Sequence, residues 1–172
     1  DIDGEAESDY SGFSVAMSAN GTTIAIGAGS NYHTQNFAGH VRVYREAGGN
    51  WSQVGADIDG EAEGDYFGTS VAMSADGTTI AIGAPSKGNS LERAGYVRVY
   101  READGKWRKI GADIDGDTQY SGFGYSIAIG DDGNTIAVGA PYNDGNETSN
   151  GRVRVYYREE PTRAPTRAPT RA

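Results

Sequence analysis

The chain has 172 residues, 26 glycines, no cysteine and a formal net charge of −9. This length is typical of a single domain, and the negative charge argues against nucleic-acid binding, because phosphates are bound by Lys and Arg. The lack of cysteine excludes disulfide bonds and thiolate metal sites, and no apolar run is long enough to insert into a membrane.

A repeat of 56 residues organises the sequence. Asp1, Asp57 and Asp113 begin three successive units that align without gaps, and the first two units differ mainly at residues 31–37 against 87–93. Internal repeats of this length are typical of propellers, solenoids and other arrays. The predicted divisions are residues 1–56, residues 57–112, an incomplete third unit over residues 113–160, and a tail over residues 161–172.

Each unit contains four short runs of alternating apolar residues. In the second unit they predict strands at residues 69–74, 78–84, 96–101 and 106–112. The dipeptides Asp76-Gly77 and Asp104-Gly105 predict two-residue hairpin turns, in which both residues accept a positive φ. Both faces of the second strand are apolar or small, so both must be covered. We interpret the phrase DIDG as the link to the next unit.

Four-stranded antiparallel units repeated in register predict an all-β fold of about three β-propeller-type blades, with an extended proline-rich C-terminal tail. A linear stack of sheets or a β-solenoid stays open as the alternative, although solenoid coils usually have shorter periods. The third unit stops after its third strand, at Tyr157. We therefore expect further units before Asp1, or missing strands supplied by a neighbouring copy, because natural β-proteins avoid exposed strand edges.

Two of the units share a further motif. It is written Phe67-Gly68 with Gly83-Ala84-Pro85, and Phe123-Gly124 with Gly139-Ala140-Pro141. The motif resembles the FG-GAP repeat of the integrin α-subunit propeller and its algal and bacterial relatives. The first unit departs from it, with Ser11-Gly12 and Gly27-Ala28-Gly29. The resemblance implies a propeller, usually of seven blades, in a secreted or cell-surface protein that binds or adheres.

Calcium is the cofactor for which the sequence offers candidate ligands, and no other cofactor is indicated. The resemblance implies a calcium loop between the first two strands, but the loops at Asp76 and Asp132 are too short for one. The acidic links offer hard oxygens on alternate residues instead. The candidate calcium ligands are Asp57, Asp59, Glu61 and Asp65, with the equivalents Asp1, Asp3, Glu5 and Asp9. Two alternatives stay open: a solvated turn bonded to backbone N–H groups, and ion pairs with Arg98 or Arg154 on the third strands.

We expect no enzyme activity, because no set of side chains typical of catalysis recurs in the chain. His33 and His40 occur only in the first unit, and we interpret both as loop or surface residues. Tyr44, Tyr100 and Tyr156 recur at the repeat period and are interpreted as packing residues. A hydrolase carried on a propeller therefore has no supporting residues.

Several segments predict modification or assembly. N-glycosylation sequons begin at Asn20, Asn50 and Asn146, in predicted surface turns. The tail PTRAPTRAPTRA predicts an extended polyproline rod, with an unstructured spacer as the alternative. The candidate O-glycosylation sites are Thr162, Thr166 and Thr170. The candidate assembly residues are Arg163, Arg167 and Arg171, which we expect to dock on the acidic body of a neighbouring copy.

Together these features predict an extracellular or cell-surface glycoprotein with a structural or adhesive role, as a subunit or fragment of a surface filament or matrix. The expected partners are other copies of the chain, or extracellular proteins or glycans. The alternative is a ligand-binding propeller module of a larger cell-surface receptor, using the acidic links and variable loops. The sequence begins with Asp rather than Met, so we expect a processed protein or part of a longer one.

Overall fold

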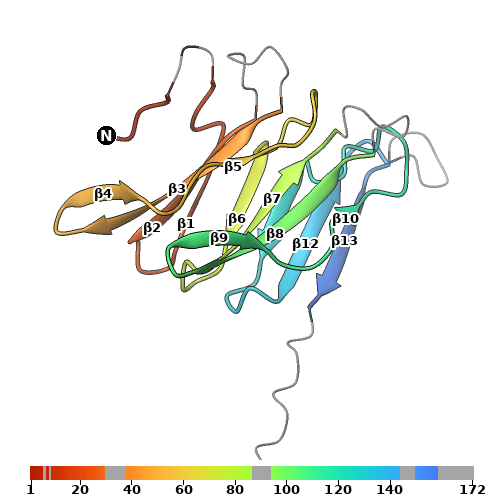
Figure 1. Cartoon of the computed structure of the whole chain (residues 1–172). Helices are drawn as coiled ribbons and strands as arrows, with labels where there is room; N and C mark the ends of the chain where they lie inside the picture. The colour runs from red at the N-terminus through yellow and green to blue at the C-terminus, as the bar shows by residue number, and fades with distance from the viewer. Residues whose placement is uncertain (6, 8, 30–37, 87–93, 144–149, 159–172) are drawn as a thin grey trace, which may run out of the picture.

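The computed structural model describes residues 1–172 except residues 6, 8, 30–37, 87–93, 144–149 and 159–172. The described residues form 13 β-strands and no helix, and none of them makes a helix with the length and hydrophobicity of a membrane span. The strands build three antiparallel sheets, which Figure 1 shows side by side, and each sheet is called a blade below. The predicted all-β fold of propeller-type blades is confirmed.

The blades follow one another along the chain. The first contains β1 (Ser14–Met17), β2 (Thr23–Ala28), β3 (His40–Ala47), β4 (Asn50–Gln53) and β5 (Ile58–Asp59). The second contains β6 (Ser70–Met73), β7 (Thr79–Ala84), β8 (Tyr96–Ala103), β9 (Lys106–Lys109) and β10 (Ile114–Asp115). The described part of the third contains β11 (Ser126–Ile129), β12 (Thr135–Ala140) and β13 (Arg152–Tyr157).

The fourth position of the second blade holds two short strands rather than one. β9 pairs with the second half of β8, and β10 pairs with its first two residues, Tyr96 and Val97. Between them Gly111 has a φ of +78°, which takes the chain out of the extended conformation. The interpretation of DIDG as a link is therefore wrong for Ile114-Asp115, and likewise for Ile58-Asp59, which pairs with β3.

The predicted turn at Asp104-Gly105 is confirmed. The two residues have φ angles of +55° and +73°, and they connect Ala103 to Lys106, which are paired partners in the sheet. Positive φ at both central positions is the requirement for the two-residue turn that matches the strand twist.

The predicted two-residue turn at Asp76-Gly77 is wrong. Of this pair only Gly77 has a positive φ, of +73°, and the loop is wider, since the backbone N–H of Ser74 donates to the carbonyl of Thr79 at 2.9 Å. The Asp76 carboxylate accepts bonds from the Ser74 hydroxyl at 2.6 Å and from the Thr78 N–H at 2.9 Å. Partial burial acts to raise the pKa of Asp76, but these hydrogen bonds hold it below its usual value.

The hydrophobic core lies between the blades. The first interface buries residues of both neighbouring blades and of the link between them: Ala25, Val41, Val43, Ile58, Phe67, Val71, Ile80, Ile82, Ala84 and Tyr96. The second interface buries Ala81, Val97, Val99, Phe123, Ile136, Val138 and Ala140. The second blade therefore uses both of its faces, as the sequence predicts. Each large apolar side chain buried in this way contributes about 1.5–3 kcal/mol.

Neighbouring blades dock through one recurring contact, from a serine hydroxyl on the inner strand of one blade to a glycine carbonyl just before the inner strand of the next. The Ser14 hydroxyl donates to the carbonyl oxygen of Gly68 at 2.8 Å. That oxygen approaches Gly27 so closely that a Cβ there would lie 2.2 Å from it, which only glycine permits. The second interface repeats both contacts with Ser70, Gly83 and Gly124, at 2.7 Å and 2.1 Å.

Candidate functional site

The acids of one link do not converge on a single point. Asp65 is buried, and its carboxylate accepts the Tyr96 hydroxyl at 2.7 Å and the Ala62 N–H at 3.2 Å. Burial, and then the hydrogen bond to Asp65, raise the pKa of Tyr96. Asp59 is exposed on β5, the strand of the first blade that corresponds to β10. Asp65 therefore acts as a buried structural acceptor.

Arg98 on β8 joins acids from two successive links. Its guanidinium donates to Glu61 at 2.8 Å and to both carboxylate oxygens of Asp113, at 3.0 and 2.9 Å. The Arg98 side chain is only 6% exposed, and its guanidinium lies 4.8 Å from the centroid of the Tyr96 ring. Burial acts to lower the pKa of Arg98, but the bonds to Asp113 and Glu61 outweigh it and raise that pKa.

Asp113 is held by two cations. Lys109 donates to its carboxylate at 2.8 Å in addition to Arg98. Burial acts to raise the pKa of Asp113, but the bonds from Arg98 and Lys109 outweigh it and keep that pKa below its usual value. In the third blade Arg154, the equivalent of Arg98, pairs with Asp117, the equivalent of Glu61. The structure thus contains the arginine pairing that the sequence left open, and calcium binding at these residues stays a prediction.

The first blade has a looser version of this network. Arg42 lies 3.4 Å from the carboxylate of Glu5 and also donates to the carbonyl of Asp3 at 3.0 Å. Asp57 accepts a bond from the Gln53 amide at 2.6 Å. Asp1 and Asp3 are exposed, whereas Asp9 is buried.

The structure brings His40 to this network, which the sequence analysis did not foresee. His40 is the first residue of β3 and is 3% exposed, so its interpretation as a loop or surface residue is wrong. It occupies the position that Tyr96 has in the second blade, and that register is the signal that would have placed it in the sheet. Each of Glu5, His40 and Asp57 offers a ligand atom, and these atoms lie within 4.8 Å of one another. His33 lies outside the described residues.

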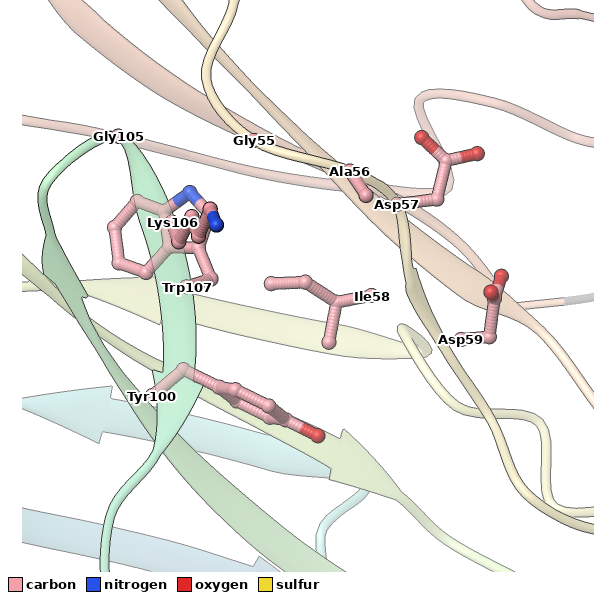
Figure 2. Close-up of a pocket in the computed structure, with 9 residues that line it drawn as sticks. All are labelled: Gly55, Ala56, Asp57, Ile58, Asp59, Tyr100, Gly105, Lys106 and Trp107. Carbon is pink, nitrogen blue, oxygen red and sulfur yellow. The ribbon is translucent and has the colours of Figure 1, made fainter.

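A cleft of about 490 Å³ opens between the first two blades, and Figure 2 shows its lining. Tyr100 and Trp107 supply aromatic rings on one side, and the Ile58 side chain points toward them from the other, whereas the carboxylates of Asp57 and Asp59 point away from the rings. The remaining lining residues are Gly55, Ala56, Gly105 and Lys106. The indole N–H of Trp107 is buried and has no hydrogen-bond partner within the described part of the chain. The sequence predicted the acids of this cleft but not its aromatic side.

Both described sequons are exposed, and their glycosylation stays a prediction. The Asn20 side-chain oxygen accepts bonds from Ser18 at 2.7 Å and from the Thr22 N–H at 3.0 Å, the role that Asp76 has in the second blade. Asn50 begins β4. The following predicted sites lie outside the described residues: Asn146, Thr162, Thr166, Thr170, Arg163, Arg167 and Arg171.

The two outer faces of the blade array are apolar and exposed. On the third blade Val153 and Val155 are 69% and 50% exposed, whereas Val97 and Val99, their equivalents in the second blade, are fully buried. On the first blade Val15 is 61% exposed, whereas its second-blade equivalent is buried. Positions that are buried at the two inner interfaces are therefore exposed to solvent at both ends of the blade array.

Residues 56–100 match the model of the FG-GAP repeat. This match confirms the resemblance over the second unit, where Phe67-Gly68 and Gly83-Ala84-Pro85 lie. No curated protein sequence matches the chain.

Several solved structures have a similar fold. A candidate 6-phosphogluconolactonase from Bacteroides uniformis is 15% identical, with a TM-score of 0.57, and the match covers 87% of this chain and 37% of that one. The periplasmic gluconolactonase PpgL from Pseudomonas aeruginosa is 15% identical, with a TM-score of 0.55 and coverage of 84% and 38%. KlAtg21, in complex with the coiled coil of AgAtg16, is 12% identical, with a TM-score of 0.58 and coverage of 86% and 39%.

These matches correct one prediction. The prediction that the chain has no enzyme activity is contradicted, because two β-propeller-like structures of similar fold carry the names of lactonases. The chain spans about two fifths of the length of the structures that it matches, 37–39%. At such low identity the likeness shows the fold alone, and function depends on the site rather than on the fold.

Proposed function

We propose that the chain is a repeat module that extends by packing further blades of its own type on its two open faces, in an extracellular structural or adhesive assembly. The observation that supports this most is the recurrence of one docking contact. The hydroxyls of Ser14 and Ser70 each donate to a glycine carbonyl of the next blade. Ser126, at the equivalent position of the third blade, is exposed.

The two open faces carry the equivalents of the residues that pack together at the inner interfaces, so they are complementary to each other. The third blade exposes Ser126, Val153 and Val155, which correspond to the residues Ser70, Val97 and Val99 at which the second blade contacts the third. The first blade exposes Val15, which corresponds to Val71, the residue through which the second blade packs on the first. A head-to-tail contact between two copies therefore repeats the internal interface. Contacts of this kind build rings or filaments, depending on whether the rotation closes.

Light scattering on purified chain tests the proposal. We expect assemblies larger than a monomer that dissociate in the variant Val155→Lys, because a lysine there would be buried without a partner. Tyr142→Lys is the matched control, since Tyr142 is also exposed, at 55%, but lies beyond the end of β12 and not in a strand. A monomer at all concentrations, or equal assembly by both variants, would count against the proposal.

The extracellular part of the proposal is supported by the exposed sequons at Asn20 and Asn50. The chain alone has a mass of 18.1 kDa, so N-glycosylation of native material would be measured as excess mass that is removed by an N-glycosidase. Native protein with the mass of the bare chain would contradict this part without affecting the assembly test.

A second function is favoured by the cleft between the first two blades: a ligand-binding module of a larger cell-surface receptor. Two aromatic rings, the Ile58 side chain and the buried Trp107 N–H are the mixture of apolar walls and few polar groups that small-ligand sites use. Binding of glycans or peptides by a monomer, lost in Trp107→Leu, would support this function over assembly.

A further inference from the structure

Glu5, His40 and Asp57 come from three separate segments of the first blade. Glu5 lies in the link before β1, His40 begins β3, and Asp57 precedes β5. His40 and Asp59 are paired partners across β3 and β5, so the sheet itself fixes His40 close to the segment that carries Asp57. One ligand atom of each residue lies within 4.8 Å of the other two.

The second blade shows what this position looks like when it is neutralised. Its equivalents of the three residues are Glu61, Tyr96 and Asp113. Arg98 binds both carboxylates at 2.8–3.0 Å, and Lys109 also binds Asp113, at 2.8 Å. In the first blade the tyrosine is replaced by His40 and the lysine by Gln53. At this site the first blade therefore has one cation fewer and one imidazole more than the second.

The remaining cation of the first blade is less firmly engaged. Arg42 reaches Glu5 at 3.4 Å and divides its donors among that carboxylate, the Asp3 carbonyl and the Ser11 hydroxyl at 3.4 Å. Asp57 takes its described bond from a neutral amide, Gln53. Glu5 is thus paired with one loosely placed arginine, and the bond described for Asp57 comes from an uncharged donor.

A third carboxylate adds to the negative charge. Asp9 is 3% exposed, and its Oδ1 is buried without a hydrogen-bond partner among the described residues. Its equivalent in the second blade, Asp65, receives the Tyr96 hydroxyl, and His40 stands at the position of that tyrosine. A buried carboxylate with an unmet acceptor is costly unless a cation lies near.

We propose that Glu5, His40 and Asp57 form a site for a divalent first-row transition ion of the zinc type. One imidazole with two carboxylates is a ligand set that suits zinc, whereas calcium takes six to eight oxygens. Zinc–ligand bonds of about 2.0–2.2 Å require the three atoms to draw closer than 4.8 Å. The Glu5 side chain, which is 53% exposed, is free to make that movement.

The test is titration of the full chain with Zn²⁺ at neutral pH, by calorimetry and by the shift of the melting temperature. We expect one high-affinity site in the wild type. His40→Tyr and Gln53→Lys together convert the site into the arrangement of the second blade, which the fold already accepts, and should weaken Zn²⁺ binding at least tenfold. His33→Ala is the matched control, because the chain has two histidines, and should leave binding unchanged. Asp57→Asn serves as a second variant if the double variant does not fold.

Two results would overturn the site. One is Zn²⁺ affinity in the double variant, or in Asp57→Asn, equal to that of the wild type. The other is loss of binding in His33→Ala with retention in the double variant, which would place the ion elsewhere. Binding of Ca²⁺ without Zn²⁺ would contradict the proposed ligand chemistry and favour an all-oxygen site.

Discussion

Replacement of Arg98 by methionine should lower the free energy of unfolding more than the loss of an exposed ion pair does. The Arg98 side chain is 6% exposed and binds Asp113, whose side chain is 18% exposed, and Glu61, which is 70% exposed. Removing one partner of a buried pair costs about 3–5 kcal/mol, because it leaves a buried charge without compensation. Lys109 continues to bind Asp113, so we expect a loss of about 2–3 kcal/mol.

Arg45→Met is the matched control for that experiment. Arg45 is 42% exposed and lies 3.8 Å from Glu102, so the loss of this pair should cost less than about 1 kcal/mol. Urea unfolding followed by fluorescence of the two tryptophans measures both variants against the wild type. A cost of Arg98→Met no larger than that of Arg45→Met would refute the reasoning.

The pH dependence provides a second check on Arg98. The pKa of Asp113 is lowered in the folded state, so its contribution to stability is present above its unfolded value of about 4 and is lost as the pH falls further. The difference in unfolding free energy between wild type and Arg98→Met should therefore be largest near neutral pH and should shrink below about pH 4. A difference that stays constant from pH 7 to pH 3 would contradict the assigned role of Asp113.

Three further substitutions test the packing. Phe67→Ala should cost about 3–5 kcal/mol, because the ring is fully buried between blades, whereas Phe13→Ala, at a 61% exposed position, should be nearly neutral in urea unfolding. Tyr96→Phe should cost about 1–2 kcal/mol and should remove part of the stability loss that the wild type shows above about pH 10, because the folded pKa of Tyr96 is raised. Gly95→Ala should lower the melting temperature far more than Gly48→Ala, since both glycines have positive φ but only at Gly95 would a Cβ lie 2.1 Å from a carbonyl oxygen. Equal effects of the paired variants, or an unchanged alkaline profile for Tyr96→Phe, would refute the corresponding assignment.

The regular part of the fold could be predicted from the sequence, because the alternation of side chains along each segment indicates where a strand lies and which residues share a face. The strand predicted at residues 78–84 is observed as Thr79–Ala84, with Ile80 and Ile82 buried on one face. The two-residue strand Ile114–Asp115 was missed, because two residues have no period to detect. The turn at Asp76 was misjudged because its side chain caps a wider loop that the dipeptide alone does not reveal.

The site was harder to predict than the fold because its residues come from different units. The acids of one link were expected to act together, but Glu61 meets Asp113 of the following link through Arg98. His40 was interpreted by its residue type, although its register with the buried Tyr96 placed it in the sheet. Contacts between units depend on how blades pack, which the sequence of a single unit does not encode.

The central claim is that open faces of two copies pack as the inner faces do. Within the chain, equivalent turns of successive blades are joined by backbone bonds from Ala19 to Ala75 at 2.9 Å and from Ala75 to Asp131 at 3.0 Å. Head-to-tail packing would place Asp131 of one copy beside Ala19 of the next.

Because the chain has no cysteine, Ala19→Cys and Asp131→Cys proteins can each carry one fluorophore at these exposed turns without disturbing the backbone bonds. Energy transfer in a mixture of the two labelled proteins is the most direct measurement. We predict strong transfer between position 131 of one copy and position 19 of another, and loss of this transfer when both labelled proteins also carry Val155→Lys. No transfer in the mixture, or transfer that Val155→Lys leaves unchanged, would contradict head-to-tail packing.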